Sequence, residues 1–192
     1  RTNPNSANYD PNLSIVIMSA TLNSDELLTH FKHTGPKKID IEGRTFPVES
    51  RLLPSTSVQD TIHQINQKST PPPTIVAKLP GLGEIAATSA DLKRDGLTLP
   101  IKHLHGQQTK AQQTKVLRSK DTGSVILATN ISQTSLTIPG VTHVVDSGIE
   151  RVNQVDYLSG LGISCLMLQH TSRDGIIQMQ GRTGRTNPGT YY

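Results

Sequence analysis

The chain has 192 residues, enough for one domain with a full core and part of a second. Hydrophobic residues make up 33% and aromatic residues 3%, with no Trp, so a core would rest on Ile, Val and Leu, as in a sheet covered by helices. The net charge of +4 weakly favours an anionic partner.

Cysteine content and hydropathy exclude several classes of protein. Cys165 is the only cysteine, which excludes an internal disulfide and a multi-cysteine zinc site, and we expect it to be an inert core thiol. No signal peptide or membrane-spanning apolar stretch appears, so we expect an intracellular protein, cytoplasmic or nuclear, with no membrane partner. His30 and His33 share a predicted helix face, but a surface pair is the simpler interpretation and no metal site is predicted.

The first residues, 1–12, are rich in Asn and Pro and indicate an arm or loop. A short apolar run at 14–18 then predicts a strand buried on both faces. A helix follows over 24–33, with Ser24 as its cap and acidic residues in its first turn.

Strands and helices alternate along the rest of the chain, which predicts βαβ units and a parallel sheet. Two further strands at 150–155 and 163–168, joined through a glycine-rich turn, predict a hairpin attached to that sheet. The expected strands are 38–42, 48–53, 74–79, 97–104, 124–129, 141–146 and 190–192, and the expected helices are 58–68, 81–92, 109–118 and 171–181.

Ligands bind such sheets at the carboxyl ends of the strands. The polar segments 80–84, 105–108 and 129–137 follow predicted strands and are therefore the candidate binding loops. Gly81 and Gly83 in the first of them indicate a tight strand-to-helix turn.

Two arginines three residues apart stand near the end of the chain, in the segment QMQGRTGR (178–185). At this spacing we expect Arg182 and Arg185 to lie on one face of a helical turn and to reach a single anion. That geometry suits a phosphate whose charge grows during transfer, although a solvated basic helix end has the same sequence.

Four segments occur in a fixed order: SAT (19–21), LPGLGEI (79–85), ATNISQTSLTI (128–138) and QMQGRTGR. In this order they resemble motifs III, IV, V and VI of the superfamily 2 helicases of the DEAH/DExH type. The resemblance covers about residues 13–192. The segments IEGRTFPVE, LPGLGEI and ERVNQVDYLSGLG most resemble the bacterial HrpB branch of that family.

The resemblance implies an α/β fold, a RecA-like (P-loop NTPase-type) parallel sheet flanked by helices with an attached β-hairpin. Residues 46–192 would form the second RecA-like lobe, the helicase C-terminal domain, and residues 1–45 a remnant of the first lobe with the linker. These residues contain no GxxxxGK[ST] phosphate loop and no acidic quartet before Ser19. ATP and Mg²⁺ would therefore be held mainly by the missing first lobe as partner, and we expect this chain alone to be inactive.

The family pattern also implies roles in nucleotide hydrolysis. Arg182 and Arg185 match arginine fingers that reach the γ-phosphate of ATP, and Gln178 matches a glutamine that lines the same cleft. For Gln178 the alternative is an amide on a helix face in water. Leu117 stands where many DEAH helicases carry a Phe stacked on the base, and it would pack more weakly there.

Other positions match contacts with the backbone of single-stranded RNA. Thr134, with Ser135 and Thr137 beside it, matches the motif V threonine, and Gly106 and Gln107 match a second phosphate contact. Capping of a helix by Thr and Ser is the alternative.

Two further features match parts that move or separate strands. Ser19 and Thr21 match the motif III pair that couples the nucleotide site to domain movement, although they could simply cap a helix. The hairpin at 150–168 matches one that helps to separate strands, and a purely structural hairpin is an equal alternative.

Three positions depart from the family pattern. Met179 stands where an Arg is usual, Gln133 replaces a glutamate, and Lys78 interrupts an apolar strand. We expect the C-terminal lobe of a DEAH-type, ATP-dependent RNA helicase. The alternative is a non-catalytic helicase-like module that binds RNA or protein, which Met179 and Gln133 favour and the retained arginines disfavour.

Overall fold

The computed structural model describes residues 13–18, 24–41, 46–119, 121, 123–130, 138–156 and 163–192. The chain divides into two compact units, 1–44 and 45–192. In the first, helix α1 (Ser24–His30) precedes the 3-10 turn η1 (Lys32–Thr34). The helix predicted here is confirmed, although Ser24 is its first residue and not its cap.

The strand predicted at 14–18 is wrong, as is the described part of the one at 38–42. Residues 13–18 and 35–41 have no strand geometry, and Val16, Met18 and Ile41 are 79%, 87% and 87% exposed. A strand needs a neighbour to satisfy its backbone N–H and C=O groups. No segment within the described ranges pairs with either run.

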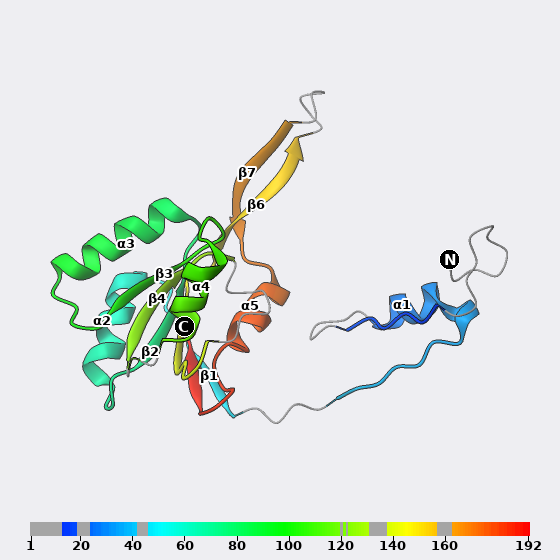
Figure 1. Ribbon diagram of the computed structural model, residues 1–192, viewed down its shortest axis with the longest axis horizontal. Coiled ribbons are helices and arrows are strands. Elements are labelled where there is room, and N and C mark those ends of the chain that lie inside the picture. Colours follow the sequence, from blue (N-terminus) through cyan, green and yellow to red (C-terminus); the bar gives the residue numbers. More distant parts are fainter. Residues whose placement is uncertain are drawn as a thin grey trace. The chain divides into compact units, whose positions relative to one another are not determined.

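The second unit is a six-stranded parallel sheet in the order β1-β8-β5-β2-β4-β3 (Figure 1). The predicted α/β class is confirmed. Residues of β4 are buried throughout, as expected for a central strand of a sheet covered on both faces. The strands are β1 (Val48–Ser50), β2 (Thr74–Lys78), β3 (Ile101–Leu104), β4 (Ser124–Ala128), β5 (His143–Asp146) and β8 (Gly189–Tyr191).

Helices cover both faces of this sheet, because neighbouring residues of a strand point to opposite sides. Ile75 and Ala77 of β2 pack against α2 (Val58–Lys68) and α3 (Leu82–Arg94). Val76 packs on the other face, with apolar residues of α4 (Lys110–Leu117) and α5 (Arg173–Gln180).

Local signals determine where several elements begin. Ser57 caps α2 by accepting a hydrogen bond from the Asp60 N–H at 3.0 Å, and α2 has its predicted bounds. Thr109 and Gln112 form a capping box at the start of α4. The strand predicted at 97–104 is shorter, because Pro100 has no N–H for the ladder and β3 begins after it.

Strands β6 (Ile149–Asp156) and β7 (Ile163–His170) form the predicted antiparallel hairpin, with Ile149 opposite His170. Figure 1 shows the hairpin extending away from the larger sheet. Cys165 lies on β7 and is partly exposed, so its expected place in the core is wrong. The turn between the strands lies outside the described residues.

Candidate functional site

The parallel sheet brings the segments that follow β2, β3, β4 and β5 to one edge, the edge at the carboxyl ends of the strands. Three polar atoms in these segments are buried without a hydrogen-bond partner among the described residues. They are Glu84 Oε2, His105 Nδ1 and Asn130 Oδ1. A buried polar atom left unpaired costs about 1–3 kcal/mol, so a polar group that paired with these atoms would bind favourably here.

Two glutamines fix the loop after β3. The Gln108 side chain accepts from the His105 N–H at 3.1 Å and donates to the His103 carbonyl at 3.1 Å. Gln113 donates to the His105 carbonyl at 3.3 Å. Gly106 and Gln107 are exposed at the tip of this loop.

The two motif VI arginines lie in the turn that follows α5. The helix ends at Gln180, and the N–H of Arg182 donates to the Met179 carbonyl at 3.0 Å. Gly184 has φ +72°, a conformation that favours glycine. The expectation that both arginines share a helix face is therefore wrong.

The Arg182 and Arg185 side chains nevertheless lie close enough to interact. Burial, followed by the charge of Arg185, lowers the pKa of Arg182, although Arg182 remains a cation at neutral pH. Arg182 is partly buried, and Arg185 is exposed and donates through Nε to the Gly181 carbonyl at 2.9 Å. An anion bound to both guanidinium groups would offset the burial and the repulsion.

Thr183, between the arginines, ties this turn to the sheet. Its buried hydroxyl lies 3.3 Å from the Val141 carbonyl and 3.2 Å from the Thr142 carbonyl, at the amino end of β5. At the other end of α5, the Thr171 N–H donates to the Gly148 carbonyl, just beyond the carboxyl end of β5. The eight residues of α5, about 12 Å long, thus run from one edge of the sheet to the other.

Comparison with known proteins identifies the family. Residues 82–187, more than half of the chain, match the family described as "Helicase conserved C-terminal domain". This chain belongs to that family. The prediction of a DEAH/DExH-type helicase lobe with a RecA-like fold is confirmed.

Two relatives come from Escherichia coli (strain K12). "ATP-dependent RNA helicase HrpB" is 37% identical over 188 residues, which cover 92% of this chain and 22% of that protein. "ATP-dependent RNA helicase HrpA" is 29% identical over 192 residues, 93% of this chain and 14% of that protein. The crystal structure of the E. coli DExH-box NTPase HrpB has a TM-score of 0.73 at 32% identity, over 91% of this chain and 22% of that one. The chain thus spans under a quarter of these relatives.

Met179 and Leu117 of this helicase C-terminal domain both contribute to its core. Met179 is fully buried against the sheet, so a sulfur-containing apolar side chain fills the position where the family usually has Arg. Leu117, at the end of α4, is partly buried in the same cluster. Gln178 of α5 is partly exposed. A nucleotide contact for Leu117 or Gln178 stays a prediction.

Several predicted site residues lie outside the parts of the chain that the structure describes. These are Ser19 and Thr21 of motif III and Thr134, Ser135 and Thr137 of motif V, together with Gln133. Their roles stay predictions.

Sequence reasoning missed a charged cluster at the root of the hairpin. Lys78, the last residue of β2, is fully buried and contacts Asp146 and Glu150, and Arg151 pairs with Glu84. The sequence signal for this cluster was Lys78 itself, a lysine in an otherwise apolar strand. Its partners could not be identified from the sequence because they lie far from it along the chain.

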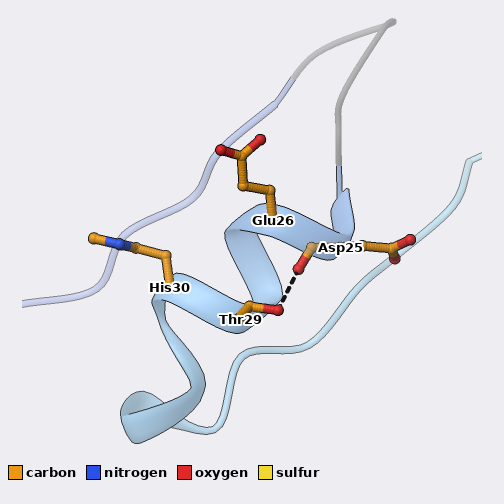
Figure 2. Close-up of a pocket in the computed structure, with 4 residues that line it drawn as sticks. All are labelled: Asp25, Glu26, Thr29 and His30. Carbon is orange, nitrogen blue, oxygen red and sulfur yellow. Dashed lines mark hydrogen bonds between the residues drawn. The ribbon is translucent and has the colours of Figure 1, made fainter.

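Helix α1 of the first unit carries acidic side chains beside a histidine. Figure 2 shows Asp25 and Glu26 pointing in different directions, and Thr29 donates to the Asp25 carbonyl at 2.7 Å. The His30 ring packs edge-on against Phe31. Across the described ranges, no three His, Cys, Asp or Glu residues are grouped to hold a metal ion, and no helix is long and apolar enough to cross a membrane.

Proposed function

We propose that this chain is the second lobe of an ATP-dependent RNA helicase, in which Arg182 and Arg185 contact the γ-phosphate of ATP held by a first lobe. The observation that carries the proposal is the pair of arginines, one partly buried and one exposed, in a turn that Thr183 holds to the sheet. Such a pair gains most from a ligand whose negative charge increases, as the phosphoryl group does during transfer.

The anchoring of the arginine turn supports this role. Thr183 fixes the segment between the arginines to the sheet, and Arg185 is bonded to the Gly181 carbonyl. Donors held in place before the reaction need no reorganisation when charge develops, which is the condition for electrostatic catalysis. Gln178, on the last turns of α5, would line the same cleft.

Mg²⁺ prefers oxygen ligands such as carboxylates, and the described residues of this lobe contain no group of three His, Cys, Asp or Glu residues that could hold a metal ion. The first lobe would therefore hold ATP and Mg²⁺, and the ion, when bound, would neutralise phosphate charge. The arginines of this lobe would act only when the two lobes close. The chain alone should then have negligible ATPase activity.

The carboxyl edge would bind the backbone of single-stranded RNA. Gly106 and Gln107 lie at the tip of a loop that the side chains of two glutamines hold in place. A Cβ added to Gly106 would meet no atom within 4 Å, so a phosphate has room to approach the backbone there. Thr134, Ser135 and Thr137 would follow Asn130 along the same edge. Hydroxyl and backbone N–H donors bind phosphates without reading the base sequence.

The test is steady-state ATPase activity of a two-lobed protein that contains this chain, with Arg182→Ala and Arg185→Ala. The expected loss in kcat is about 10³-fold or more, as for other arginine fingers. Arg173→Ala is the control, because Arg173 is an exposed arginine at the start of α5, the helix that precedes the arginine turn. If all three variants turn over ATP at the rate of the unmodified protein, the arginines are not catalytic and the proposal is wrong. Absence of turnover in the unmodified protein would favour the non-catalytic module. Turnover by this chain alone at the rate of the two-lobed protein would contradict the need for a first lobe.

A further inference from the structure

The root of the β6–β7 hairpin is held by charged contacts on both of its faces. Glu150 and Arg151 are neighbours in β6, so their side chains point to opposite sides of the strand. Glu150 contacts Lys78 at 3.5 Å, and Arg151 donates to Glu84 at 2.9 Å. The first contact joins the hairpin to the end of β2, and the second joins it to α3, the helix that follows β2.

On the first face, Lys78 is the centre of a buried cluster. Its Nζ lies 3.6 Å from Asp146 and hydrogen-bonds to the Thr171 hydroxyl, one residue beyond β7. Glu150 of β6 and Thr171, which follows β7, therefore both contact the same ammonium group. A buried cation is stable only with such a full set of partners, so the lysine fixes the positions of these groups.

The same cluster extends into the sheet through Asp146. Its carboxylate accepts from the Tyr191 hydroxyl at 3.0 Å and from the Gly148 N–H at 2.8 Å. Burial and then the charge of Asp146 raise the pKa of Tyr191, so the tyrosine stays a donor at physiological pH. The hairpin root is thus linked to β5 and β8.

On the second face, Arg151 lies over the segment that enters α3. A Cβ added to Gly81 would come within 2.4 Å of Arg151 Nη1, whereas one added to Gly83 meets nothing within 4 Å. Gly81 has an extended backbone (φ −166°) that any residue can adopt. The short strand-to-helix turn predicted here is present, between Lys78 and Leu82, but it does not require glycine's backbone freedom at position 81. The missing side chain of Gly81 instead makes room for the guanidinium group. The Asn130 amide also donates to the Arg151 carbonyl at 3.3 Å.

We propose that Lys78 and Arg151 are positioning residues that hold the hairpin at a fixed angle to the sheet, so that it acts on an RNA duplex as a rigid arm. The use on RNA rests on the proposed function, whereas the fixed angle does not. A two-stranded hairpin is marginally stable by itself, and this one exposes Leu166 and Leu168 at 70% and 57%. Its orientation must therefore come from its root.

Cys165 supplies a natural probe, because it is the only cysteine and lies on β7. A second label site is introduced by Lys93→Cys on the exposed surface of α3, and pulsed electron paramagnetic resonance measures the distribution of distances between the two spin labels. We expect a narrow distribution in this chain. Arg151→Glu and Glu84→Arg should each broaden it, and the two together, which restore the ion pair, should narrow it again. Lys78→Met should also broaden it.

Arg173→Glu and Lys115→Met, at exposed sites, are the controls with the same changes of charge. A width that is unchanged in Arg151→Glu, Glu84→Arg and Lys78→Met would overturn the proposal, even if their melting temperatures fall. So would a double exchange that stays as broad as the single ones. The Glu84–Arg151 pair is partly exposed, so its variants decide the question if Lys78→Met does not fold.

In a two-lobed protein, Arg151→Glu should lower duplex unwinding per ATP hydrolysed, and the double exchange should restore it. Complete absence of ATP hydrolysis in the unmodified protein would contradict the proposed function and leave the label result standing. Equal unwinding per ATP in all variants, with a broadened distance distribution, would overturn the role as a rigid arm.

Discussion

At the scale of single residues, the environment of a side chain decides what a departure from a family pattern means. In the sequence, a Met at position 179 in place of the usual Arg favoured a non-catalytic module. In the structure Met179 is fully buried between α5 and the sheet, where it packs with Val76 and Val144. It therefore stabilises the helix that carries the arginine turn, and it gives no support to a non-catalytic module.

Restoring the usual residue at this position tests that view. Met179→Arg would bury an additional cation in an apolar cluster, and we expect the free energy of unfolding to fall by about 3–5 kcal/mol. Met179→Leu keeps the volume and should cost less than about 1.5 kcal/mol. Urea denaturation of this chain measures both. Equal stability of Met179→Arg and the unmodified chain would show that the position is not a core site.

Lys78 is the residue whose role was least predictable from sequence. Its contact with Thr171 joins positions 93 residues apart. A single sequence contains no signal for such a pairing, because it arises only when β2, β5 and the hairpin root meet. A lysine inside an apolar strand indicates that a partner exists but does not identify it.

At the scale of elements, local signals were sufficient where they were strong. Helix α2 has its predicted bounds because a serine cap precedes it and three prolines follow it. Strands β2 and β4 were found because each is a short apolar run that follows a helix. The run at 14–18 looks the same in sequence but forms no strand, since pairing with another strand is a long-range condition.

The spacing of the arginines led us to expect them on one face of a helical turn, but the helix ends at Gln180 and Gly184 has φ +72°. Gly184→Ala tests how closely the arginine turn packs against Phe46 and Val48. A Cβ there would lie 2.6 Å from Val48 Cγ2 and 2.8 Å from the Phe46 carbonyl oxygen. Gly140→Ala is the matched control, with a similar φ (+71° against +72°) and no atom within 4 Å.

Both alanine variants carry backbone strain of about 1–3 kcal/mol, and only Gly184→Ala adds the clash. Thermal unfolding should therefore show a clearly larger loss of stability in Gly184→Ala. If the two variants lose the same stability, the turn is less closely packed against β1 than the structure indicates.

At the scale of the whole molecule, the sheet separates two sets of groups. Loops with unsatisfied polar atoms lie at its carboxyl edge, and the arginine turn lies at the amino end of β5, with α5 running between them. The alternation of strands and helices in the sequence was enough to predict the α/β class and to place the candidate loops after the strands. It could not predict that charged pairs fix the hairpin between these loops, because that depends on tertiary packing.

Contact between the arginines and the γ-phosphate should appear in nucleotide affinity, because ATP differs from ADP only in that group. The most direct measurement is the ratio of the Kd for ADP to the Kd for a non-hydrolysable ATP analogue, in a two-lobed protein that contains this chain. A hydrogen bond to a charged group contributes about 1.5–3 kcal/mol, so Arg182→Ala and Arg185→Ala should each lower this ratio by about tenfold or more, while Arg173→Ala leaves it unchanged. The same ratio in all four proteins would contradict the account.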